Sequence, residues 1–185
     1  MAQILGVIAS GAERTATIVK DLRTFSRVEE GTTSVVDLRE GLRITINLLR
    51  PRWKDRITIH SAVDGMPRVE CDSGQVNQVF MNVISNACDA IAKTGNIWIQ
   101  ATSDGESVAV AIRDDGAGIA RSNLPRIFDP FFTTKQIGQG TGLGLAIAHG
   151  IVQKHGGRIT VRSEVGVGTE IVVHLPIRER RRSVA

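Results

Sequence analysis

Two asparagines on one predicted helix are the first residues whose types and spacing could do chemistry. Asn82 and Asn86 are four positions apart, so they share a face of a helix predicted over residues 74–93. Asparagine is a poor helix-interior residue because its amide competes for backbone hydrogen bonds, so this pair suggests amides that serve a ligand. An amide oxygen suits Mg²⁺, which also keeps waters and phosphate oxygens in its shell. Two solvent-exposed polar residues are the alternative interpretation.

A second group directly follows a predicted strand. Residues 114–119 read Asp-Asp-Gly-Ala-Gly-Ile. A carboxylate at this point can accept a hydrogen bond from an exocyclic amine, and the glycines would let a flat ring approach the backbone. An ordinary turn explains the same residues equally well.

A glycine run opens a later predicted helix. Residues 138–145 read Gly-Gln-Gly-Thr-Gly-Leu-Gly-Leu. The unpaired N–H groups and the positive dipole end of a helix form a cradle for phosphate, and glycine permits close approach. The run matches neither common nucleotide fingerprint, because leucine takes the sixth position of Gly-x-Gly-x-x-Gly and the chain has no Gly-Lys pair. A last group, Gly-Val-Gly-Thr at 166–169, is by itself a hairpin turn.

The elements that must position these groups alternate between helices and strand pairs. Helices are predicted over 3–27, 38–49, 74–93 and 142–155, and strands over 56–60, 96–102, 107–113, 158–163 and 169–175. Asp37 is the expected N-cap of the second helix and Pro51 its expected end, while residues 29–34 read as a linker. This order predicts an α/β (α+β) sandwich, with helices layered on one face of a mixed sheet.

The first helix carries a weak heptad seam and cannot bury it alone. The seam consists of Ile4, Ile8, Gly11, Thr15, Ile18, Leu22 and Phe25. Either this helix pairs with another chain, or it is one half of a larger hairpin.

Composition limits the remaining function classes. The 185 residues are 42% hydrophobic and 23% charged, which indicates one soluble globular domain with an appendage. The net charge of +4 is concentrated in the Arg-Glu-Arg-Arg-Arg tail at 178–182, so the body has no basic footprint for nucleic acid. We interpret the tail as a solvated end of the chain, with contact to an acidic partner as the alternative. Two cysteines suit a reducing compartment, and no apolar stretch approaches a membrane span. A cytoplasmic location is therefore expected, either for the protein itself or for the cytoplasmic portion of a membrane sensor.

Taken in order, these groups resemble the N, G1, F, G2 and G3 boxes of sensor histidine kinases, the F box being Phe-Asp-Pro-Phe-Phe-Thr-Thr-Lys at 128–135. The resemblance covers about residues 36–176 and implies the two-layer Bergerat-type sandwich shared with gyrase, Hsp90 and MutL, with about three helices. It divides the chain into part of a dimerisation and phosphotransfer hairpin (1–30), a catalytic ATP-binding domain (31–177) and a basic tail (178–185). The Asn-Ala-Cys-Asp-Ala and Phe-Phe-Thr-Thr-Lys segments are similar to the nitrogen-regulation-like branch of the family.

The resemblance also implies roles for individual residues, with ATP and Mg²⁺ as cofactors. Asn86 would hold Mg²⁺, Asp114 would meet the adenine amine, and Thr169 would support that carboxylate through water. Lys135 would reach the phosphates from a mobile lid anchored by Phe128, Phe131 and Phe132, which could instead be ordinary core aromatics. The full implied binding set is Asn82, Asn86, Asp89, Asp114, Gly116, Gly118, Ile119, Thr134, Lys135, Gly140, Thr141, Gly142, Leu143, Gly144, Leu145 and Thr169, with catalysis assigned to Asn86 and Lys135.

Two positions depart from family patterns. Members that contact phosphate three residues after the metal asparagine place a lysine or arginine there, whereas this chain has Asp89, which is expected to meet water or metal instead. The family's ATP hydrolases carry a glutamate one turn before the metal asparagine, whereas this chain has Asn82, whose amide cannot act as a base. The resemblance therefore favours a kinase over a hydrolase.

The four histidines do not supply a phosphoacceptor. The family needs a histidine followed by an acidic residue on a hairpin helix, and none of His60, His149, His155 and His174 has that neighbour. We expect transfer of the ATP γ-phosphate to a histidine outside this chain. The implied partners are an acceptor hairpin, a response-regulator receiver domain and a second copy of the chain paired through residues 3–27. An ATPase clamp of the gyrase or Hsp90 kind and a non-catalytic nucleotide-dependent scaffold remain alternatives.

Overall fold

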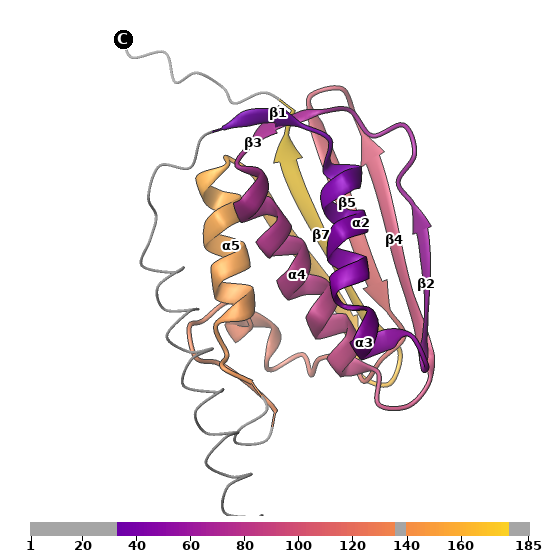
Figure 1. Cartoon of the computed structure of the whole chain (residues 1–185). Helices are drawn as coiled ribbons and strands as arrows, with labels where there is room; N and C mark the ends of the chain where they lie inside the picture. Colours follow the sequence, from indigo (N-terminus) through magenta and orange to yellow (C-terminus); the bar gives the residue numbers. More distant parts are fainter. Residues whose placement is uncertain (1–32, 136–139, 178–185) are drawn as a thin grey trace, which may run out of the picture.

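The computed structural model describes residues 33–135 and 140–177. The predicted helix at 3–27 with its dimerisation seam, the basic tail and Gly138 lie outside the described residues. Figure 1 shows the arrangement of the described elements.

A five-stranded mixed sheet forms one layer. Its order is β2-β4-β5-β7-β6, in which β2 (Ile57–Ala62) runs parallel to β4 (Gly95–Ser103). The antiparallel strands are β5 (Ser107–Asp114), β7 (Gly168–Pro176) and β6 (Arg158–Glu164). Each of these strands lies within two residues of its predicted bounds, because alternating side chains and flanking glycines mark them clearly.

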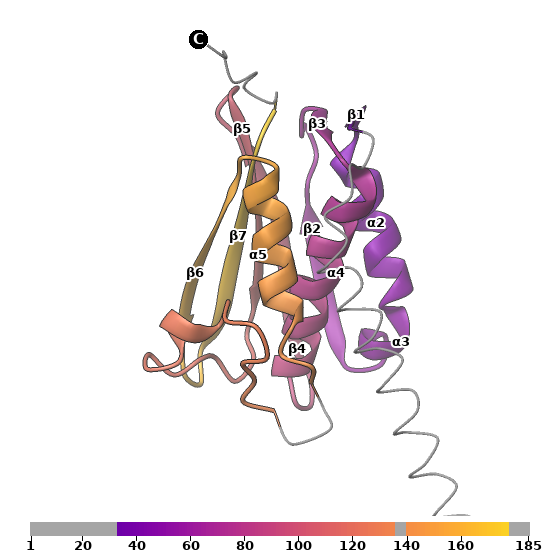
Figure 2. The same cartoon turned by 90° about the vertical axis from the view of Figure 1, so that its left-hand side faces the viewer.

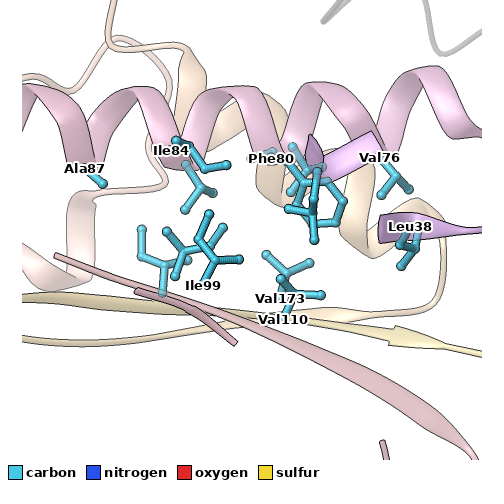
Figure 3. Packing of buried hydrophobic residues seen from close by; sticks show 14 of the residues in the cluster. Leu38, Val76, Phe80, Ile84, Ala87, Ile99, Val110 and Val173 are labelled. Atoms are coloured by element: carbon cyan, nitrogen blue, oxygen red, sulfur yellow. The ribbon is translucent and has the colours of Figure 1, made fainter. Parts of the chain in front are cut away.

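Three helices form the second layer on one face of this sheet, as predicted (Figure 2). The central helix α4 (Ser73–Ala90) lies between α2 (Leu38–Leu48) and α5 (Gly144–Lys154) and packs against both. In Figure 3, Phe80 and Ile84 of α4 point toward Ile99, Val110 and Val173 of the sheet. All five of these side chains are fully buried, so the core lies between α4 and the three central strands.

The ends of α4 are fixed by specific polar contacts. At its start, the Asp72 side chain accepts a hydrogen bond from the Gln75 backbone at 3.0 Å, which confirms one of the two predicted caps. At its end, the Arg56 guanidinium donates to the carbonyl oxygens of Cys88, at 2.9 Å, and of Ile91. The Ala117 backbone N–H donates to the carbonyl of Ala90 at 2.9 Å. These donors replace the helical ones, so α4 ends at Ala90 rather than at the predicted residue 93.

Four short elements were not predicted. The strands β1 (Ser34–Val36) and β3 (Val69–Cys71) pair with each other, and β1 begins at the last residue of the predicted linker. Pro51 lies in the first turn of a separate helix α3 (Arg50–Trp53), where proline is tolerated, rather than simply ending α2. The loop from β5 to α5 contains one 3-10 turn, η1 (Leu124–Arg126). Among the described residues, none of the helices combines the length and apolar character that a membrane crossing requires.

Candidate functional site

Asp114 is the buried carboxylate of the candidate site. It is the last residue of β5, it is only 4% exposed, and it accepts a hydrogen bond from the Gly116 backbone at 2.9 Å. Burial raises the pKa of Asp114 more than the hydrogen bonds from the backbones of Gly116 and Thr169 lower it. A buried acceptor of this kind suits a ligand that brings its own N–H donors.

Thr169 and Ser163 continue from Asp114 across the sheet. Thr169 lies opposite Asp114 in the β5–β7 register and opposite Ser163 in the β6–β7 register. The Ser163 hydroxyl lies 2.8 Å from the Thr169 hydroxyl, accepts from the Ile119 backbone at 2.8 Å and donates to the Gly168 carbonyl at 2.9 Å. Sequence reasoning missed Ser163, because a serine in an alternating strand carries no signal until its partners across the sheet are known.

The two glycines expected to lie against a flat ring are also required by the packing of the chain itself. A Cβ on Gly116 would lie 2.6 Å from the carbonyl group of Ala90. A Cβ on Gly118, which has a φ of +70°, would lie 2.0 Å from the Glu164 carbonyl oxygen. The loop after β5 is therefore pressed between the end of α4 and the β6–β7 turn, and only glycine fits at either contact.

Asn82 connects the two helices that border the site. Its side-chain amide donates to the Gly144 carbonyl at 2.9 Å, which ties α4 to the first residue of α5. The Leu143 backbone N–H donates to the Thr141 hydroxyl at 3.3 Å, and the Leu143 side chain is buried. Any contact of Leu143 with phosphate would therefore use its backbone. The expected glycine-run cradle lies at this helix start, next to α4.

Lys135 brings the F-box segment to α4. Its ammonium donates to the Asp89 carboxylate at 2.6 Å and lies 3.4 Å from the side-chain oxygen of Asn86. Arg52 pairs with the other oxygen of Asp89 and also donates to Ser85. Asp89 thus lies between two cations, an arrangement that sequence reasoning missed because Arg52 is far from α4 along the chain.

The F-box aromatics are not all alike. Phe128 stacks on His149 of α5 with 4.7 Å between ring centroids, and the Arg126 guanidinium lies 4.6 Å from the centre of the Phe132 ring. Phe131 is instead 61% exposed with a φ of +67°, and its backbone blocks any Cβ on Gly142 at 2.4 Å. Phe131 is therefore not a core aromatic. Its backbone lies directly against Gly142.

The other expected binding residues lie in the same region. Thr134 is exposed, and a Cβ on Gly140 would lie 3.2 Å from both the Lys135 side chain and the Thr133 hydroxyl. Leu145 packs against the core from the first turn of α5. A separate surface hollow of about 530 Å³ is lined by residues 54–58, 94–96 and 115 and contains none of the expected site residues. That hollow is open to solvent and lies at the α3–β2 turn, apart from the side chains of the candidate site.

The oxygen donors near Lys135 fit a magnesium ion. Asn86 offers a neutral amide oxygen and Asp89 a carboxylate, both of the kind that Mg²⁺ prefers, and both already face a cation in the form of the Lys135 ammonium. Within the described ranges, no group of three or more His, Cys, Asp or Glu side chains is placed to hold a metal ion.

Comparison with known proteins identifies the family. Residues 71–179 match the family described as histidine kinase-, DNA gyrase B- and HSP90-like ATPases. The chain belongs to this family.

Its relatives include sensor kinases of several bacteria. The chain is 35% identical to the sensor histidine kinase ZraS of Escherichia coli K12, over 97% of this chain and 39% of ZraS. It is 36% identical to the sensor kinase CckA of Brucella abortus, over 94% of this chain and 20% of CckA. The chain thus spans about two fifths of the first relative and one fifth of the second.

Solved structures give the same fold. Full-length ShkA in complex with AMPPNP has a TM-score of 0.82 and 28% identity, over 95% of this chain and 38% of ShkA. The histidine kinase ThkA in complex with the response regulator TrrA has a TM-score of 0.80 and 27% identity, over 97% of this chain and 52% of the matched chain. These matches confirm the predicted two-layer sandwich, while the nitrogen-regulation-like branch stays a prediction.

Proposed function

We propose that this chain is the catalytic and ATP-binding part of a sensor histidine kinase that transfers the ATP γ-phosphate to a histidine outside the chain. The observation that carries the proposal is that two separate motifs, the glycine run and the F box, meet the asparagine-bearing stretch of α4. Asn82 holds the first residue of the glycine-run helix, and Lys135 of the F box reaches Asn86 and Asp89. The AMPPNP bound in ShkA supports ATP as the ligand.

In this proposal each motif takes one part of the nucleotide. Asp114 accepts a hydrogen bond from the adenine amine, and the backbone from Thr141 to Gly144 faces the phosphates at the start of α5. Asn86 holds Mg²⁺, which neutralises phosphate charge when it is bound. Lys135 leaves Asp89 and turns its ammonium to the phosphates. Asn86 and Lys135, the two catalytic residues, thereby stabilise the phosphate charge and hold the phosphates in position.

Transfer to histidine is favoured over hydrolysis because the chain offers no base at the family's hydrolytic position. The amide of Asn82 is occupied by the Gly144 carbonyl and cannot take a proton from water. A neutral imidazole is already nucleophilic and mainly needs positioning and charge stabilisation.

The proposed partners follow from the family. The segments of this chain at 1–30 and 178–185 lie outside the described residues. Residues 1–30 would be the second helix of a dimerisation and phosphotransfer hairpin, residues 3–27 would pair with a second copy, and residues 178–185 would form a basic tail. A response-regulator receiver domain would take the phosphate, in keeping with the ThkA–TrrA complex. The cytoplasmic location also stays a prediction.

The test is transfer of label from [γ-³²P]ATP with Mg²⁺. The chain is incubated alone and with a separate helical hairpin that carries a histidine followed by an acidic residue. We expect label on the hairpin only, and its loss with Asn86→Ala and with Lys135→Met. Lys54→Met is the matched control, because Lys54 is an exposed lysine whose ion-pair partner is Asp55 at 3.8 Å. Label on the isolated chain, or phosphate release that ignores the hairpin, would contradict the proposal and favour self-phosphorylation or an ATPase clamp.

A further inference from the structure

We infer that Ser163 is a positioning residue that fixes the direction of the Thr169 hydroxyl, and thereby makes the Asp114 end of the site selective for an amino group. The inference rests on the proposed function, in which the adenine amine meets Asp114. It concerns a residue that none of the motifs includes.

The sheet register places the three side chains in one row. Asp114 of β5 lies opposite Thr169 of β7, and Thr169 lies opposite Ser163 of β6. Residues directly opposite in an antiparallel pair point to the same face, with Cβ atoms about 4.5–5.5 Å apart. Thr169 therefore lies between a carboxylate and a second hydroxyl. Asp114 and Thr169 are 4% and 7% exposed, so the row is largely shielded from bulk water.

Counting protons assigns the donors within this row. The Ser163 hydroxyl has three contacts, with the Ile119 N–H at 2.8 Å, the Gly168 carbonyl at 2.9 Å and the Thr169 hydroxyl at 2.8 Å. A backbone N–H can only donate and a carbonyl can only accept, so the single hydroxyl proton of Ser163 is donated to the Gly168 carbonyl. The Thr169 hydroxyl must then donate to Ser163, because no other assignment satisfies all three contacts.

This assignment decides what Thr169 offers to a ligand. With its proton committed to Ser163, the Thr169 oxygen keeps only lone pairs for other partners. An ionised Asp114 is also an acceptor. The Asp114 carboxylate and the Thr169 oxygen are therefore two neighbouring acceptors, which favour a ligand group with N–H or O–H donors. A 6-amino group on a purine meets that requirement, directly or through one water, whereas a 6-oxo group brings a third acceptor. Without Ser163, the Thr169 proton is released and can turn toward a 6-oxo group.

The experiment compares two nucleotides that differ at this position. Dissociation constants of ATP and inosine triphosphate, both with excess Mg²⁺, are measured by calorimetry for the whole chain and its variants. We expect Ser163→Ala to lower the ratio Kd(ITP)/Kd(ATP) about fivefold, the effect of one neutral hydrogen bond. Ser163→Thr keeps the hydroxyl and should keep the ratio. In a Thr169→Val background, Ser163→Ala should cause no further fall.

Ser103 supplies a matched control. Its hydroxyl also accepts from a turn N–H, that of Gly105 at 3.2 Å, and donates to a carbonyl, that of Ser107 at 3.0 Å, but it lies in the β4–β5 hairpin. Ser103→Ala should leave the ratio unchanged. Ser163→Cys, whose thiol is only a weak donor and acceptor, should lower the ratio in the same direction and repeats the test if Ser163→Ala fails to fold.

Two results would overturn the inference, and they differ from failure of the proposed function. If Ser163→Ala and Ser163→Cys change both dissociation constants by the same factor, Ser163 only supports the loop through Ile119. If neither constant changes, Ser163 has no role in recognition. If the unaltered chain binds no ATP at all, the proposed function fails together with this inference.

Discussion

Lys135 and Asp89 form an ion pair, with 2.6 Å between Nζ and Oδ2, that joins the F-box segment to the last turns of α4. The same ammonium lies 3.4 Å from the amide oxygen of Asn86, the residue proposed to hold Mg²⁺. In this state a protein cation therefore occupies the surroundings of the proposed metal ligand. In the proposed function, binding of a nucleotide with its metal would redirect Lys135 away from Asp89.

Asp89→Asn should strengthen the binding of ATP in the absence of divalent metal by about two- to fivefold, the usual range for a partly exposed ion pair. The reason is that Lys135 no longer has a competing carboxylate and turns to the phosphates without breaking a pair. Equilibrium titrations in EDTA measure the effect. In a Lys135→Met background the gain should disappear. Asp55→Asn is the control of equal charge change, and unchanged or weaker binding by Asp89→Asn would rule out the competition.

Gly118→Ala should destabilise the fold more than Gly105→Ala. Both glycines have positive φ values, +70° and +87°, so both substitutions carry a backbone cost of about 1–2 kcal/mol. Only Gly118 is blocked, by the Glu164 carbonyl oxygen at 2.0 Å, while nothing lies within 4 Å of a Cβ on Gly105. We expect a further loss of about 1–3 kcal/mol for Gly118→Ala. Denaturant unfolding checks the difference, and equal losses would show that the contact with the β6–β7 turn is loose.

Asp114→Asn should stabilise the nucleotide-free chain while weakening ATP binding. Burial raises the pKa of Asp114 in the folded state, so the folded chain holds this proton more tightly than the unfolded chain. The stability contributed by Asp114 therefore falls as the pH rises from the ordinary value of 3.8 through the raised pKa. The variant should be more stable than the unaltered chain at pH 7, and this advantage should shrink as the pH falls toward 3.8. ATP affinity should drop at least about tenfold, because a charged acceptor is lost.

Asp115→Asn is the matched control, and it should change the free energy of unfolding in the opposite direction. Partial burial alone would raise the pKa of Asp115, but the hydrogen bonds from Asn96 outweigh it and lower the pKa. Its stabilising contribution is present above the ordinary pKa and is lost as the pH falls through the lowered value. Asp115→Asn should therefore be less stable than the unaltered chain at pH 7. Unfolding free energies measured between pH 3 and pH 7 compare the two variants, and the same sign for both would refute the burial argument.

The large elements could be predicted because their signals are local. The apolar face of α4, its Asp72 cap and the alternation of each strand can each be recognised from a short stretch of neighbouring residues. The strands β1 and β3 have three residues each, too few for a period to be read, and each is stabilised by the other across more than thirty positions. Short elements of this kind are fixed by tertiary pairing and not by their own residues.

The same contrast between local signals and long-range contacts applies to the candidate site. Its motifs could be listed from residue types, but their partners could not. Arg52 reaches Asp89 from a helix 37 positions earlier, and Ser163 reaches Ile119 from a strand 44 positions later. Gly116 and Gly118 were expected to accommodate a ring, whereas the structure shows that backbone crowding also requires glycine there. A motif indicates that a residue is special, and the fold is needed to say which neighbour makes it so.

The most direct measurement of the central claim is a calorimetric titration of the chain with ATP, with and without Mg²⁺, repeated on Asn86→Ala. We expect the unaltered chain to bind one ATP, with an affinity that Mg²⁺ increases, and we expect Asn86→Ala to lose this increase. Failure of the unaltered chain to bind ATP, or an undiminished effect of Mg²⁺ in Asn86→Ala, would contradict the claim.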